Sequence, residues 1–121
     1  MPTHLKLSND QSYVLVVQTG PLRAEEIYQA RAESLPLYQQ CEKALVDYRL
    51  ADISSIPFLE IDTLAAEFRN DVPKCKRMAI VRTQGKDEAH YIHLQKVCVI
   101  RGVDTQIFDT LTDAQNWLAK T

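Results

Sequence analysis

Two histidines, His90 and His93, have the spacing that most directly suggests metal chemistry. Three positions apart on a helix, two imidazoles can reach one ion, as they do in many zinc sites. Zinc needs further protein ligands, and the nearest acidic residues, Asp87 and Glu88, fall at the expected start of the same helix. The pair also lacks the flanking glutamate of a zinc-hydrolase motif. We therefore expect no metal ion at these histidines. A pair of surface or half-buried histidines without a ligand accounts for their spacing.

The three cysteines could supply nucleophilic thiols. Cys98 follows His90 by more than two helical turns, about 12 Å along the axis, so we expect it to be a small core residue. Cys41 and Cys75 each precede a strand and could be exposed. No CxxC spacing occurs, and three separated cysteines indicate free thiols in a reduced, cytoplasmic setting. Because no GxGxxG or Walker loop is present either, we predict a protein that is not an enzyme and has no cofactor.

The segment that contains Asp52, Ser54 and Ser55 lies between a predicted buried strand and a predicted helix. Helix N-termini carry free backbone N–H groups and the positive end of the helix dipole. Open α/β sheets place ligands beyond the carboxyl ends of their strands, where this segment falls. The alternative is that Ser54 or Ser55 merely caps the helix. Ile56 and Phe58 add apolar area, so these five residues are the candidate partner- or ligand-binding residues.

Length and charge narrow the classes of function. With 121 residues and 45% hydrophobic residues, the chain is predicted to form a single domain over residues 1–121. Its net charge of −2 does not suggest nucleic-acid binding, which usually needs a basic excess. No apolar run reaches the roughly 18 residues of a membrane span, and the first residues lack a signal-peptide pattern.

Apolar periodicity predicts an α/β fold in the order β-β-α-β-α-β-α-β-α, with a mixed, mainly parallel sheet of four to five strands. The first strand should be antiparallel because a short turn joins it to the second. Continuous apolar runs place residues 13–17, 44–48 and 78–81 at the centre of the sheet. The strands are expected at about 4–8, 13–17, 44–48, 76–82 and 107–108, and the helices at about 22–35, 57–68, 87–102 and 111–118.

Several local signals set the ends of these elements. Pro36 should end or kink the first long helix, and residues 49–55 should form a loop. Asp87 can cap the third helix, and Gly102 suits the position just after its end. Thr110 and Asp113 resemble a capping box, and Trp117 is expected to be largely buried on the last helix.

The order of elements resembles the STAS fold of anti-sigma-factor antagonists, especially the SpoIIAA-like group. The residues behind this resemblance are 44–47, 77–81 and the C-terminal run of Phe108, Ala114, Trp117 and Leu118. The resemblance implies a non-catalytic module that binds a protein partner or a small ligand. It also implies that Ser54 and Ser55 are candidate phosphorylation sites, because a serine at the second helix start is the switch in that family. The family motif reads Asp-Ser-Ser-Gly, whereas this chain has an isoleucine after Asp52 and no glycine.

Two functions therefore remain open. The first is a regulatory, protein-binding module whose contact surface centres on residues 52–57. The second is a carrier or sensor of a small apolar ligand held between the sheet and its helices, since the SpoIIAA-like group also resembles the CRAL-TRIO lipid-transfer fold. The partner classes left open are another protein, a small apolar ligand and a second copy of the chain.

Overall fold

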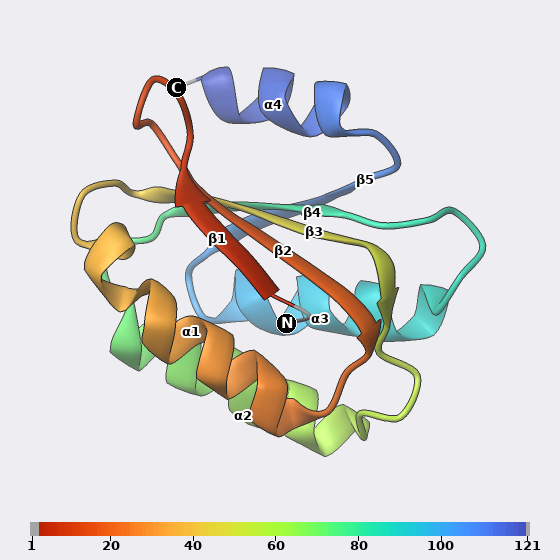
Figure 1. Cartoon of the computed structure of the whole chain (residues 1–121). Helices are drawn as coiled ribbons and strands as arrows, with labels where there is room; N and C mark the ends of the chain where they lie inside the picture. Colours follow the sequence, from red (N-terminus) through yellow and green to blue (C-terminus); the bar gives the residue numbers. More distant parts are fainter. Residues whose placement is uncertain (1–2, 121) are drawn as a thin grey trace.

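Five strands form one sheet in the spatial order β1-β2-β3-β4-β5 (Figure 1). The computed structural model describes residues 3–120, and Met1, Pro2 and Thr121 lie outside that range. That residues 1–121 form a single domain stays a prediction. The first pair of strands is antiparallel and the other three pairs are parallel, which confirms the predicted mixed sheet. The strands are β1 (Thr3–Leu7), β2 (Val14–Pro21), β3 (Lys43–Asp52), β4 (Arg77–Val81) and β5 (Asp104–Phe108).

The handedness of the connections decides where the helices lie. Each parallel connection steps to the next strand in the same direction, and such crossovers are almost always right-handed. The three crossover helices therefore share one face of the sheet, while the last helix covers the other face (Figure 1). The helices are α1 (Ala24–Tyr38), α2 (Phe58–Asp71), α3 (Glu88–Ile100) and α4 (Leu111–Ala119).

The central strands are those predicted from their apolar runs. β2, β3 and β4 each have a neighbour on both sides. Most side chains of β3 and β4 are buried, whereas buried and half-buried side chains alternate along most of β2. Leu45 and Ile80 are fully buried on opposite faces: Leu45 packs on the α4 side, and Ile80 packs under α1, α2 and α3. A strand covered on both faces reads as a continuous apolar run, which is why this part of the prediction is confirmed.

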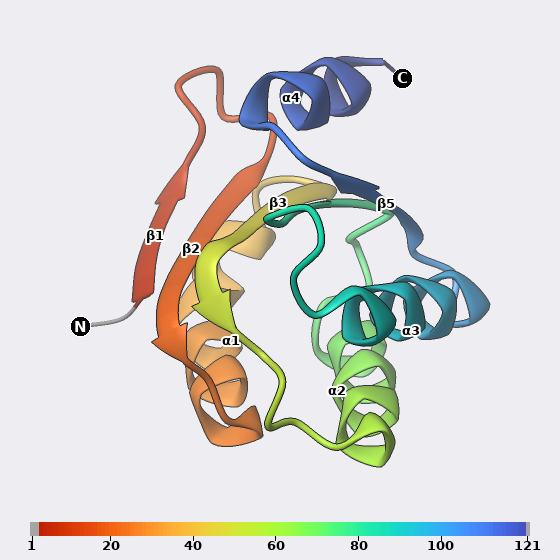
Figure 2. The ribbon, with the colours of Figure 1, turned by 90° about the vertical axis from the view of Figure 1, so that its right-hand side faces the viewer.

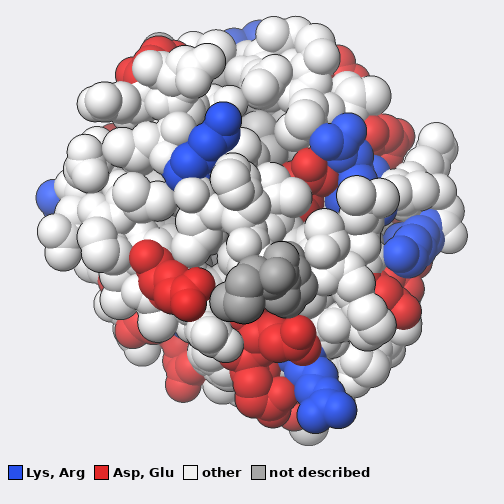
Figure 3. All heavy atoms as spheres, in the orientation of Figure 1, with Lys and Arg blue, Asp and Glu red and all other residues white. Residues whose placement is uncertain are grey.

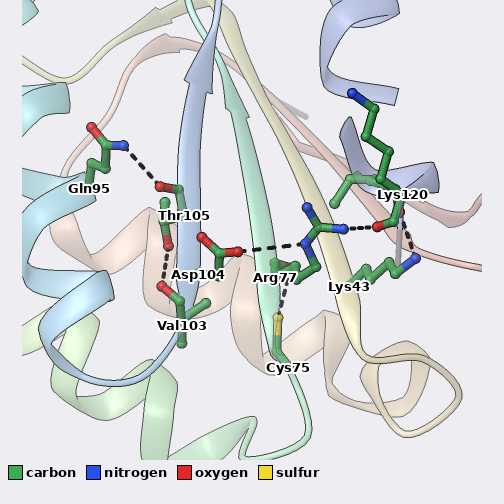
Figure 4. A network of polar contacts seen from close by, with 9 residues as sticks. Lys43, Cys75, Arg77, Gln95, Val103, Asp104, Thr105 and Lys120 are labelled. Atoms are coloured by element: carbon green, nitrogen blue, oxygen red, sulfur yellow. Dashed lines mark hydrogen bonds and ion pairs between the residues drawn. The ribbon is translucent and has the colours of Figure 1, made fainter. Parts of the chain in front are cut away.

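Side chains of the sheet fix the helix α4 by its last turn (Figure 4). The Lys43 ammonium donates a 2.6 Å hydrogen bond to the Leu118 carbonyl, and the Arg77 guanidinium donates to the Lys120 carbonyl. The Arg77 guanidinium also lies 4.0 Å from the centre of the Trp117 ring. Trp117 is therefore half-buried under a cation rather than largely buried as expected, and the fully buried residue of this turn is Leu118.

Several predicted boundaries are wrong. β2 extends to Pro21 and β5 begins at Asp104, and two further differences have a visible cause. Pro36 lies inside α1, which continues to Tyr38 because the buried Tyr38 ring packs edge-on against Phe68 and stabilises the last turn. β3 continues through the predicted loop to Asp52, because its last residues pair with the end of β2. The guanidinium of Arg49 makes two hydrogen bonds of 2.9 and 3.0 Å to Asp47, which explains a carboxylate in a central strand.

The helix caps follow the predictions in part. Thr110 accepts a hydrogen bond from the Asp113 amide at the start of α4, and Gly102 has the positive φ of a residue just after a helix end. Asp87 stands at the N-cap position of α3, but its side chain does not cap that helix. Its carboxylate accepts a hydrogen bond from the Ile53 amide instead, which links α3 to the segment before α2.

Candidate functional site

The β3–α2 loop, residues 53–57, connects the carboxyl end of β3 to the start of α2 (Figure 2). Hydrogen bonds fix the loop and its flank to two neighbouring connections. The Leu22 amide donates to the Asp52 carbonyl at 2.9 Å, and the Ser55 hydroxyl donates to the Leu22 carbonyl at 3.2 Å. The Ile53 amide donates to the Asp87 carboxylate at 3.3 Å. The loop is thus positioned by the start of α1 on one side and the start of α3 on the other.

Neither serine of this loop caps α2. The Ser54 amide and hydroxyl both donate to one oxygen of Asp52, at 2.9 and 2.6 Å, and these bonds lower the pKa of Asp52. The N-cap position of α2 is held by Pro57, which has no side-chain donor or acceptor. Both serines are exposed at the surface, so the structure leaves their hydroxyls accessible beside the start of a helix.

The apolar residues of the segment divide into two groups. Ile53 and Ile56 are each 2% exposed and face the core, whereas Phe58 is 43% exposed and Leu59 is 80% exposed. The exposed apolar area next to the serines therefore comes from the first two residues of α2. Sequence reasoning did not identify Leu59, although its place outside the Ile61, Leu64 and Phe68 face of the helix could have indicated it.

The two histidines contact the same Phe58 side chain. The His93 ring stacks on the Phe58 ring with centres 4.8 Å apart, and the His90 ring meets it edge-on at 4.9 Å. The Nε2 atom of His93 lies 2.6 Å from a carboxylate oxygen of Asp62. Within residues 3–120, no three histidine, cysteine or acidic side chains are grouped to hold a metal ion. These rings instead hold Phe58 at the start of α2.

All three cysteines are buried and free. This corrects the expectation that Cys41 and Cys75 could be exposed, since each contributes to the core beside its strand. Burial raises the pKa of the Cys75 thiol to about 12 and that of the Cys98 thiol to about 11. A buried thiol with a raised pKa is a poor nucleophile, because the reactive species is the thiolate.

A cavity of about 90 Å³ lies between the sheet and the three helices on its α1 face. Ile53 and Ile56 form part of its wall, so the β3–α2 loop separates the cavity from the exposed serines. Most other lining residues are apolar. The polar exceptions are Gln18, Arg31, Ser34, Tyr38 and Tyr48.

Comparison with known proteins identifies the fold. No family model matches the sequence, and no curated protein matches it. An uncharacterised protein of the DUF3478 family with a SpoIIAA-like fold, from Shewanella loihica PV-4, matches 96% of this chain and 91% of its own at 19% identity and a TM-score of 0.66. The anti-sigma factor antagonist SpoIIAA, in its unphosphorylated form, matches 98% and 97% at 12% identity and a TM-score of 0.62. The chain has the STAS/SpoIIAA-like fold, as its element order predicted.

Helix length and hydropathy also bear on membrane association. None of the helices within residues 3–120 is both long enough and apolar enough to cross a bilayer.

On the face seen in Figure 3, acidic and basic side chains are interspersed. The expectation that the protein does not bind nucleic acid stays a prediction.

Proposed function

We propose that this chain is a non-catalytic regulatory module that binds a protein partner through the β3–α2 loop and the start of α2. The observation that carries the proposal is the combination of two exposed hydroxyls, Ser54 and Ser55, with exposed apolar side chains at Phe58 and Leu59. An apolar patch with a polar rim is the usual composition of a protein contact surface. The hydrogen bonds to Leu22 and Asp87 order this surface before a partner binds, which lowers the entropic cost of association.

The fold supports the same assignment. One of the structures with this fold is described as an anti-sigma factor antagonist in its unphosphorylated form, which is a regulatory role for that protein. The non-catalytic part is supported by the state of the groups that could react, because the thiols are buried and the histidines pack on Phe58. The proposal places the protein in a reducing compartment such as the cytoplasm, with which three free thiols are consistent.

Phosphorylation of Ser54 or Ser55 is the switch that we propose for this surface. A phosphate adds about −1.5 to −2 charge at neutral pH. On Ser55 it replaces the hydroxyl that donates to the Leu22 carbonyl, so the charge faces a carbonyl oxygen and the loop loses one of its attachments. On Ser54 the phosphate lies beside the Asp52 carboxylate. In the unphosphorylated protein, that carboxylate accepts hydrogen bonds from both the amide and the hydroxyl of Ser54.

A carrier of an apolar ligand is the second function considered, and the cavity bears on it directly. About 90 Å³ is less than the roughly 150 Å³ that holds one benzene molecule in an engineered protein core. A lipid chain is several times larger than benzene. The volume therefore favours the binding module over a carrier of long apolar molecules.

Two matched variants test the contact surface. Leu59 at the start of α2 and Ile100 at the end of α3 are exposed to almost the same extent, 80% and 78%. Leu59→Asp is expected to reduce capture of the partner from host lysate about tenfold, because an anchor of the apolar patch is lost. Ile100→Asp makes the same chemical change outside the patch and should leave capture unchanged. Equal capture by both variants, or equal loss by both, would contradict the proposed surface.

A further inference from the structure

Arg31 is a charged residue in an unusual place. It lies in the middle of α1, is 7% exposed, and lines the cavity between the helices and the sheet. Its guanidinium donates to the Leu64 carbonyl at 3.1 Å and to the Asp71 carboxylate at 3.2 Å. The rings of Tyr28 and Phe68 lie 5.1 and 5.8 Å from it. Buried charges are usually paired, but the Asp71 side chain is 50% exposed and solvent screens its charge.

Two tyrosine hydroxyls belong to residues that line the same cavity as Arg31. Tyr38 and Tyr48 both line the cavity, and neither hydroxyl makes a hydrogen bond within residues 3–120. Burial raises the pKa of both hydroxyls, and the positive charge of Arg31 opposes that rise at each of them. Both tyrosines are therefore protonated at neutral pH and available as hydrogen-bond donors. Because both tyrosines line the cavity, their hydroxyls can donate to an acceptor that enters it.

The side-chain amide of Gln18, another polar group in the cavity, can also donate a hydrogen bond to a ligand. Gln18 is 1% exposed, and its amide nitrogen has two long contacts, 3.4 Å to Thr3 and 3.5 Å to the Glu26 carbonyl. The cavity thus combines a guanidinium, two hydroxyls and an amide with walls of aliphatic side chains. Donors around a cation select a ligand that has acceptors and negative charge.

We propose that the cavity binds a small monocarboxylate, with its carboxylate on Arg31 and its aliphatic end among the apolar side chains. Arg31 can donate two parallel hydrogen bonds to a carboxylate, and the hydroxyls of Tyr38 and Tyr48 supply further donors. The ligand competes with Asp71 for the guanidinium, which leaves the half-exposed Asp71 free to be solvated.

The volume restricts the ligand to a short chain. By proportion with the roughly 150 Å³ that accommodates the six carbons of benzene, about 90 Å³ holds about four non-hydrogen atoms. The cavity is partly open to solvent, so a slightly longer molecule such as propionate can extend from it. A ligand with so few atoms binds weakly, and we expect a millimolar Kd.

Propionate titration followed by amide and methyl NMR tests this site. The wild-type protein is expected to show saturable shifts at the cavity wall, including Ile53 and Ile56, whereas sodium chloride at matched ionic strength and propan-1-ol give none that saturate. Arg31→Met should abolish saturation, and Asp71→Asn should tighten binding several-fold because it removes the internal competitor. Tyr48→Phe should weaken binding about fivefold through the loss of one hydrogen bond.

Tyr91→Phe is the matched control for the tyrosine variant. Tyr91 is also buried and its ring lies 6.2 Å from that of Tyr48, but it does not line the cavity, so this variant should bind propionate like the wild type. If Arg31→Met does not fold, Asp71→Asn and the two phenylalanine variants still test whether the cavity binds a monocarboxylate. Linear, unsaturated shifts in the wild type, or equal binding by Asp71→Asn, would overturn the proposal. Equal binding of propionate and propan-1-ol would also overturn it. These outcomes concern the cavity alone and leave the protein-contact surface to its own tests.

Discussion

Leu118→Ala is expected to lower the free energy of unfolding by about 3 kcal/mol. Leu118 is 1% exposed and belongs to the smaller core between α4 and the sheet, with Leu45, Ala79 and Val81. Truncating a buried leucine removes apolar burial and leaves a cavity that its neighbours fill incompletely. The hydrogen bond from Lys43 to the Leu118 carbonyl is retained, because it involves the backbone.

Urea unfolding measures this loss directly. Asn116→Ala on the same helix is the control, since Asn116 is exposed and surface changes usually alter stability by less than about 0.5 kcal/mol. A loss below about 1 kcal/mol for Leu118→Ala would mean that α4 is not packed as described. Trp117, which we expected to be largely buried, is half-buried and lies against the Arg77 guanidinium.

Ser55→Asp is expected to weaken partner binding by about thirtyfold, equivalent to about 2 kcal/mol. The substitution removes the hydroxyl that donates to the Leu22 carbonyl and places a negative charge against that oxygen. It therefore changes both the charge and the attachment of the β3–α2 loop. The readout is the Kd of the purified complex for each variant.

Ser55→Asn separates these two effects. Asparagine has the size of aspartate, and its amide can still donate to the Leu22 carbonyl, so binding should stay within about threefold of the wild type. Equal weakening by aspartate and asparagine would show that charge does not control this surface, and the proposed phosphorylation switch would then be wrong.

The order of elements could be predicted because it depends on local apolar patterns. β4 is a clear example, since five consecutive residues that are buried or half-buried form a strand with a helix on each side in sequence. The extent of β3 could not be predicted in the same way. Arg49 and Leu50 look like loop residues in the sequence. Leu50 is held in the strand by pairing with Thr19 of β2, and Arg49 is held by its contact with Asp47.

Part of the candidate site could likewise be predicted from the local sequence, whereas the rest depends on contacts between distant segments. The position of the β3–α2 loop follows from the strand that precedes it, and Ser54 and Ser55 are exposed there. That Ile53 and Ile56 turn inward depends on contacts with distant segments, including the hydrogen bond from Ile53 to Asp87. The burial of Arg31 depends on Leu64 and Asp71 in another helix, so no local pattern in α1 indicates it.

Hydrogen-exchange mass spectrometry of the protein with and without its captured partner tests the contact surface at the β3–α2 loop most directly. Amides that a partner covers exchange more slowly, whereas uncovered amides keep their rates. We predict protection of residues 52–60 in the complex and unchanged exchange in α4, which lies on the opposite face of the sheet (Figure 1). Protection confined to α4, with unchanged exchange at residues 52–60, would contradict the assignment of this loop as the contact surface.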